Sequence, residues 1–427
     1  MTERPQGLVR TIGRWSLTAL MVNSIVGVSI FKLPADLARN LHGWSPLSCI
    51  VAGAGILIIA GCIAEVSSRY EETGGLYLYA RDAFGRFVGL LVAWMTWLTR
   101  IAAPAAAANL VWSYAAKFLP ELANKQGKFL VLVVLIGHLA LFNCRGVKMG
   151  RNLSNFFTAV KVGLLLAFAV AGFWALTARP GLRVPLDLPV VPVKTWFETM
   201  LLLVYAYGGF EGALFVGGES ENPKRDTPIA LLAALVAVCL IYTAVQYVTV
   251  ATLPGAGTSE RPLADAAQRF LGSGGAATIA MAALLSGYGY LSANVLHAPR
   301  LTFALAQQGD FPKFLGIIHE KYHTPHVSIL LYSLLVFLFA MIGDFHWNAL
   351  LSAVSRLAVY LAMAVAVPIL RLRDDGRARF QLPAPYLFSG LGILFSVVLA
   401  AQMGLSEFAI MGATSAIALA NWIAVRR

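Results

Sequence analysis

The chain has 427 residues, of which 58% are hydrophobic and only 13% are charged, and its formal net charge is +12. A soluble domain carries about 25% charged residues, so this composition excludes an ordinary soluble protein and predicts an all-α polytopic membrane protein. The Lys and Arg residues lie in short segments between apolar runs and form no basic stripe, which argues against nucleic-acid binding.

Twelve apolar segments recur along the chain, and we predict that each crosses a lipid bilayer as a helix. In chain order they are 16–40, 45–67, 86–118, 128–143, 153–177, 196–218, 229–253, 275–304, 327–343, 347–371, 386–402 and 404–424. An even number places both termini on one side. Lys and Arg in the loops of that side outnumber those of the other by 20 to 9, so both termini are predicted to be cytoplasmic in an inner-membrane protein.

The first segment carries its least lipophilic residues at its midpoint, in NSIVGVSIF (23–31). Gly loosens a helix, and Ser and Asn hydrogen-bond their own backbone. A second stretch of this kind, YAYGGFEGALFVGG (205–218), lies in the sixth segment. Unwound backbone at membrane depth is tolerated where it lines a cavity or is buried in protein. Two such stretches in corresponding positions indicate a transport site between broken helices 1 and 6.

The two breaks also suggest an internal repeat. The first unit comprises segments one to five and the second comprises segments six to ten, and an odd number of segments in a unit requires the second unit to be inverted relative to the first. We therefore predict a 5+5 inverted repeat, with a first repeat in 1–190, a second in 191–375, and helices 11 and 12 in 376–427.

Cysteine and histidine placement predicts no metal or cofactor. Four cysteines lie far apart in or beside apolar segments, without a CxxC pair. His319 and His323 have i, i+4 spacing, but no further set of ligands accompanies them. The short loops also lack a nucleophile–base arrangement, so an enzyme is not predicted, and no filter motif indicates a channel.

Five motifs in the same order resemble those of amino-acid permeases of the amino acid–polyamine–organocation superfamily, over nearly the whole chain. They are NSIVGVSIFKLP (23–34), AEVSSRYEETGGLYLYARDAFG (64–85), GGESENPKRDTPIA (217–230), RLTFALAQQGDFPKF (300–314) and HEKYHTPHVSIL (319–330). Asn23 and Ser29 depart from the family, which has Gly at both places. The resemblance implies the LeuT-like fold and transport of an amino acid by alternating access.

The resemblance also implies which groups hold the substrate. It assigns the substrate carboxylate to backbone around Gly27, Val28 and Ser29, and the ammonium to carbonyls near Ser24 and Ile25 and in 205–208. The alternative is that these small residues only allow close helix packing. The full set of predicted substrate-binding residues is Asn23, Ser24, Ile25, Gly27, Val28, Ser29, Tyr205, Tyr207, Gly208, Gly209 and Phe210, with Tyr205 as an aromatic gate.

Ionisable residues inside the apolar segments are expensive and usually functional. Lys161 in the fifth segment matches a lysine of proton-coupled family members. The ammonium of that lysine lies where a sodium ion binds in related transporters. Two other interpretations remain open: a fixed structural cation, or a side chain that reaches the cytoplasmic interface. Glu211 is predicted to take part in proton movement or gating. Arg100 and Arg356 either pair with buried carboxylates or meet an anionic substrate side chain.

These observations together predict a secondary active amino-acid transporter, coupled to protons as a symporter. An amino-acid or amine exchanger is the alternative, and a sodium-coupled permease is a third. The expected partners are a small-molecule amino acid, the proton and the lipid bilayer, with the protein a monomer or homodimer.

Overall fold

The computed structural model describes residues 13–70, 75–146, 151–214, 220–373 and 378–425, and its architecture is all-helical, as the composition predicted. Its α-helices are α1 (Arg14–Ile25), α2 (Leu33–Leu41), α3 (Ser45–Ser67), α4 (Gly75–Phe84), α5 (Arg86–Phe118), α6 (Lys125–Cys144), α7 (Arg151–Ala178), α8 (Val193–Tyr207), α9 (Phe210–Leu214), α10 (Pro223–Thr252), α11 (Pro262–Gln307), α12 (His326–Ile342), α13 (Phe345–Leu372), α14 (Pro385–Ala400) and α15 (Leu405–Val425).

A helix or an interrupted pair of helices lies at each of the twelve predicted segments. Within the described ranges, eight helical stretches are long and apolar enough to cross a membrane, with 33–67 counted as one, and α12 and α14 are shorter apolar helices. The number of twelve crossings therefore stays a prediction.

Two elements differ from the prediction. Helix α4 is an additional short helix, and α11 contains a further short helical part from Pro262 that precedes the predicted segment 275–304. Gly272, with φ of 74°, breaks the regular conformation inside α11, because glycine adopts a positive φ at no steric cost.

Local sequence signals explain where several helices begin. The side chain of Asn124 accepts a hydrogen bond from Gly127 N at the start of α6, and Asp344 does the same from Trp347 N at the start of α13. Such side chains satisfy N–H groups that the first turn leaves unpaired. Proline stands in the first turn of α3, α10, α11 and α14, where its missing N–H costs nothing.

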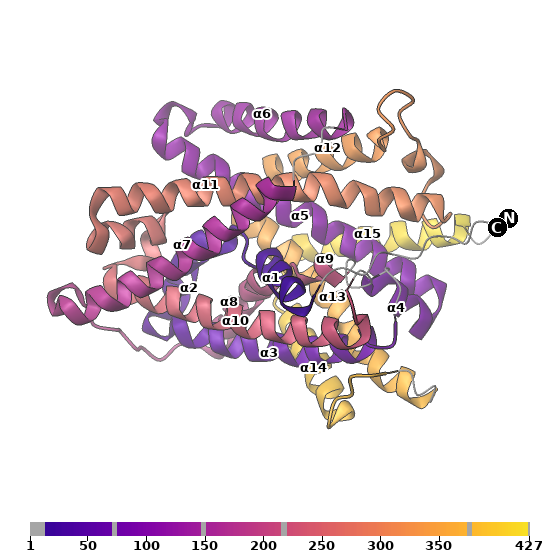
Figure 1. The fold of residues 1–427 in the computed structure, drawn as a ribbon, viewed down its shortest axis with the longest axis horizontal. Coiled ribbons are helices and arrows are strands. Elements are labelled where there is room, and N and C mark those ends of the chain that lie inside the picture. The colour runs from indigo at the N-terminus through magenta and orange to yellow at the C-terminus, as the bar shows by residue number, and fades with distance from the viewer. Residues whose placement is uncertain (1–12, 71–74, 147–150, 215–219, 374–377, 426–427) are drawn as a thin grey trace.

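The first broken segment runs beside α10. At one end, Arg14 Nη2 of α1 lies 2.8 Å from Asp226 Oδ1 near the start of α10. At the other end, Arg39 Nε of α2 donates to Gly257 O, just beyond the end of α10, at 3.0 Å. The interval between α1 and α2 is buried, because Val26, Val28 and Ser29 are 0%, 1% and 4% exposed. Figure 1 shows α1 and α9 near the centre of the projection, with α6 and α14 toward its edges.

Two groups of helices pack around this centre. Helix α10 contacts α1, α3 and α7, whereas α5 contacts α11, α12 and α6, and α13 contacts α5 as well as α3 and α8. The core is continuous across both groups. The interrupted helices are thus enclosed by protein, which is the condition for irregular backbone at membrane depth.

Candidate substrate site

The predicted interruption of the first segment is present. Helix α1 ends at Ile25, and Val26 has a non-helical ψ of 87°. A single 3₁₀ turn, Ser29–Phe31, follows before α2 begins at Leu33. No backbone carbonyl among the described residues accepts a hydrogen bond from the N–H groups of Gly27, Val28 or Ser29. Val28 and Ser29 therefore offer buried donors to a bound group.

The second interruption is also present. Helix α8 ends at Tyr207, and Gly208 has φ of −80° and ψ of 170°. Gly209 has a φ of 117°, which only glycine adopts readily, before α9 begins at Phe210. The end of the predicted stretch, residues 215–218, lies outside the described residues.

The two interruptions touch each other. An ideal Cβ placed on Gly209 would lie 2.2 Å from Ser24 O and 3.0 Å from Ser24 C. Glycine is therefore required at 209 for two independent reasons, its φ and its contact with α1. The structure thus brings together residues almost two hundred positions apart, as a shared site requires.

Tyr242 of α10 links the ends of both helices. Its hydroxyl lies 3.2 Å from Ile25 O and 3.2 Å from Ala206 O, within the last turn of α1 and α8. These carbonyls belong to the regions predicted to hold the substrate ammonium. Tyr242 was not among the predicted site residues. The one signal in the sequence was a tyrosine within an apolar segment, because a buried tyrosine hydroxyl needs a hydrogen-bond partner.

We expect Tyr242→Phe to destabilise the protein by about 1–3 kcal/mol, because two buried carbonyls lose a shared donor. Melting temperature of the purified protein would measure this loss. Tyr247→Phe is the matched control on the same helix, since the Tyr247 ring stacks on Phe173 and its hydroxyl bonds no described residue. Equal melting temperatures for the two variants would contradict the bridging role.

Lys161 of α7 reaches the first interruption. Its Nζ donates to Asn23 O at 2.8 Å. In this structure the side chain therefore points to the end of α1 and does not extend toward the interface. A fixed cation and a proton carrier would both make this contact.

Glu211 holds the second interruption together. Its Oε2 accepts from Gly209 N at 2.7 Å, and its Oε1 accepts from the hydroxyl of Tyr360. Arg356 Nε lies 3.4 Å from the same Oε1. Tyr360 was not among the predicted residues.

The predicted aromatic residues have different environments. Tyr205 is 6% exposed and makes an edge contact with Phe345, whereas Tyr207 donates to Cys49 O of α3 at 2.7 Å. Phe210 stacks on Tyr360. The ring of Tyr290, in α11, lies 3.8 Å from the ideal Cβ position of Gly27. Tyr205 and Tyr290 thus border the interruptions, and Tyr207 is directed into the contact with α3.

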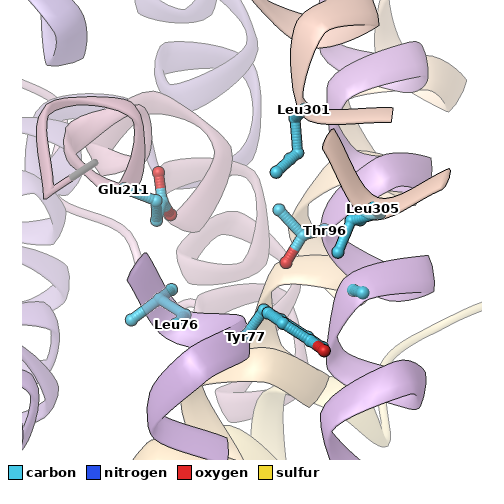
Figure 2. Close-up of a pocket in the computed structure, with 7 residues that line it drawn as sticks. Leu76, Tyr77, Thr96, Glu211, Leu301 and Leu305 are labelled. Carbon is cyan, nitrogen blue, oxygen red and sulfur yellow. The ribbon is translucent and has the colours of Figure 1, made fainter. Parts of the chain in front are cut away.

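A pocket of about 290 Å³, including its part open to solvent, adjoins Glu211. Figure 2 shows Glu211 on one side of it and Thr96 and Tyr77 on the other. It is lined by Leu76, Tyr77, Ala93, Thr96, Glu211, Leu301 and Leu305. The pocket therefore reaches the second interruption from the side of α4.

Polar contacts surround the far side of this pocket. The hydroxyl of Tyr77 donates to Asp310, whose other oxygen lies 2.9 Å from Arg86 Nη2. Burial, followed by the hydrogen bond to Asp310, raises the pKa of Tyr77 to about 12, so the phenol stays a donor at neutral pH. These contacts tie α4 and α5 to the loop after α11.

The described geometry is that of two broken helices meeting inside a bundle, and the chain also matches a known family model. The model described as "Amino acid permease" matches residues 12–419. The chain belongs to the amino acid permease family. The resemblance of the five motifs is therefore confirmed, and this permease is a multi-pass membrane protein of a family of transporters.

Individual relatives transport different compounds. The permease is 25% identical to the methylthioribose transporter of Bacillus subtilis, over 92% of this chain and 89% of that protein. It is 26% identical to the serine/threonine exchanger SteT of the same organism, over 89% and 87%, and 24% identical to its branched-chain amino acid permease BcaP, over 94% and 90%. The relatives include an exchanger, so they do not determine the mode of coupling.

Proposed function

We propose that this permease is a secondary active amino-acid transporter of the cytoplasmic membrane that works by alternating access. The observation that carries the proposal is the contact between the two interruptions, at Gly209 and Ser24. Backbone N–H groups of Gly27, Val28 and Ser29 would bind the substrate carboxylate, and carbonyls at the ends of α1 and α8 would bind its ammonium. The permease would therefore recognise the part common to all amino acids through its backbone.

The helix contacts support a division into moving parts. Helix α10 contacts α1, α3 and α8, and α3 also contacts α8. These four helices would rock as a bundle against α5, α6, α11 and α12. In this proposal, 1–190 and 191–375 form inverted repeats, 376–427 lies outside them, and both termini are cytoplasmic. The protein would act as a monomer or homodimer.

We further propose that transport is proton symport through Lys161. Its ammonium contacts the carbonyl of Asn23 at the end of α1, so loss of its proton would change the hydrogen bonding of the first interruption. Glu211 joins the second interruption to the pocket and would relay or gate the proton. Ionisable groups in such positions are commonly part of proton pathways.

We expect Lys161→Ala to remove the dependence of uptake on a pH gradient. A gradient of one pH unit supplies about 1.4 kcal/mol per proton, enough for about tenfold accumulation. Uptake of labelled amino acids into proteoliposomes, with and without the gradient, would measure it. Lys128→Ala is the matched control, because Lys128 Nζ also donates to a carbonyl, that of Gly343 at 3.0 Å, away from the interruptions. Gradient-driven accumulation that persists in Lys161→Ala would refute the coupling role.

Exchange is the second candidate, favoured by the similarity to the exchanger SteT. In that case, amino acid inside the liposomes would stimulate uptake, and neither a pH gradient nor a sodium gradient would drive accumulation in empty liposomes. A response to sodium alone would instead indicate the sodium-coupled permease.

A further inference from the structure

Arg356 of α13 is a buried cation whose hydrogen-bonding capacity is used only in part. The residue is 5% exposed. Its Nε and Nη1 are buried and have no hydrogen-bond partner among the described residues. Buried polar groups nearly always find a partner, and an unpaired charged group is the costliest exception. A bound group that accepts hydrogen bonds would give Nη1 a partner.

The guanidinium of Arg356 lies directly on the second interruption. An ideal Cβ on Gly208 would be 0.9 Å from Arg356 Nη1 and 2.0 Å from Cζ. Gly208 thus leaves the space that the guanidinium fills. The next residue, Gly209, contacts Ser24 of α1. The unpaired nitrogens are therefore beside the place where the substrate is proposed to bind.

Glu211 does not accept a hydrogen bond from the guanidinium of Arg356. Both carboxylate oxygens already accept other hydrogen bonds, one from Gly209 N and one from Tyr360. The contact between Arg356 Nε and Glu211 Oε1 is 3.4 Å and is an ion pair without a hydrogen bond. A guanidinium presents a fork of donors that matches a carboxylate held by two parallel bonds. Nε faces Glu211, so it is the end of the guanidinium that carries Nη1 that remains available for a carboxylate here.

The local charge also favours an anion. Arg100 Nη2 of α5 lies 3.7 Å from the ideal Cβ position of Gly212 in α9, one residue beyond Glu211. Two guanidinium groups thus accompany the carboxylate of Glu211, which acts electrostatically on both. A cationic substrate side chain would add repulsion, and a neutral one would leave Arg356 Nη1 without a charged acceptor.

We infer that Arg356 binds the side-chain carboxylate of the substrate and makes this permease selective for amino acids with an anionic side chain. The inference rests on the proposed function, since the α-carboxylate and ammonium would be held by the interruptions. Arg356 then acts as a specificity-determining residue, and Arg100 contributes favourable charge without a required contact.

Wild-type protein gives the first test. Glutamate and glutamine have nearly the same shape and differ in side-chain charge, so they isolate the effect of the carboxylate. We expect glutamate or aspartate to raise the melting temperature of the purified protein at concentrations at least about tenfold below those needed for glutamine or asparagine, because a site built to pair a polar group rejects an analogue that leaves it unpaired. Lysine should have no effect. This measurement needs no variant to fold.

Variants give the second test, by competition for uptake in proteoliposomes. Arg356→Gln should lose the preference for glutamate over glutamine, and Arg356→Lys should retain part of it through charge. Arg269→Gln removes one exposed positive charge from α11, away from the interruptions, and should keep the wild-type preference. Binding through the α-carboxylate instead would weaken glutamate and glutamine equally in Arg356→Gln.

Several results would overturn the inference. Equal or better recognition of neutral or cationic amino acids by the wild type would do so, as would an unchanged preference in Arg356→Gln. In these cases the protein still transports amino acids, so the proposed function stands. If no amino acid binds to or is transported by the wild type, the proposed function fails, and the inference fails with it.

Discussion

Replacing Gly209 with alanine is expected to reduce transport by about 100-fold or more. The new Cβ would lie 2.2 Å from Ser24 O, and a φ of 117° strains any residue with a side chain. The contact between the two interruptions would have to open, and a displacement of about 1 Å at a reacting or binding centre costs about 100-fold in rate. Initial rates of uptake in proteoliposomes, normalised to the amount of inserted protein, would measure the effect.

The chain supplies matched controls for this substitution. Gly137 of α6 and Gly163 of α7 have no atom within 4 Å of an added Cβ. Alanine favours a helix over glycine by about 1 kcal/mol, so Gly137→Ala and Gly163→Ala should retain transport and stability. If Gly209→Ala transports as well as these controls, the contact at Ser24 is not part of the site.

Replacing Glu65 with alanine is expected to destabilise the protein by about 1–3 kcal/mol, the cost of leaving buried hydrogen-bonding groups without a partner, because the side chain of Arg371 is 25% exposed and water can reach it. Glu65 is 1% exposed. It accepts from Arg371 Nε at 2.6 Å and Nη2 at 2.8 Å, and from Leu382 N at 2.8 Å. Without the Glu65 carboxylate, the guanidinium of Arg371 and the backbone N–H of Leu382 both lose their hydrogen-bond acceptor. Thermal unfolding of the purified protein would report the loss.

An exposed ion pair provides the control for Glu65. Lys194 Nζ and Glu198 Oε1 lie 3.7 Å apart on α8, and the side chains are 78% and 46% exposed. Pairs of this kind contribute about 0.5 kcal/mol or less within a helix, so Glu198→Ala should unfold close to the wild-type temperature. A Glu65→Ala protein with wild-type stability would show that water replaces the lost carboxylate.

The interruptions could be predicted because their cause is local. Gly27, Gly208 and Gly209 weaken a helix wherever they occur, and their apolar surroundings place them in the membrane. The helix positions followed from hydrophobic patterning for the same reason. Hydrophobic patterning did not predict the short helix that begins at Pro262, because this segment is too polar to belong to the apolar run that follows the kink at Gly272.

The partners across the bundle could not be predicted, because they depend on which helices become neighbours. Tyr242 is one of many aromatic residues in apolar segments, and only the packing of α10 against α1 and α8 gives its hydroxyl two carbonyls. The sequence left two partners open for Arg356, a buried carboxylate or a substrate anion. The structure shows that Glu211 lies 3.4 Å from Arg356 and already accepts a hydrogen bond from Tyr360.

The sequence by itself determined that this protein is a helical membrane protein, where its long apolar helices lie and where two of them are interrupted. These properties depend on hydrophobicity and backbone freedom, which act over a few neighbouring residues. The tertiary structure decided that the interruptions meet, that Lys161 points to one of them, and that Arg356 lies on Gly208. Such contacts join residues far apart in the chain, and they are set by the packing of whole helices.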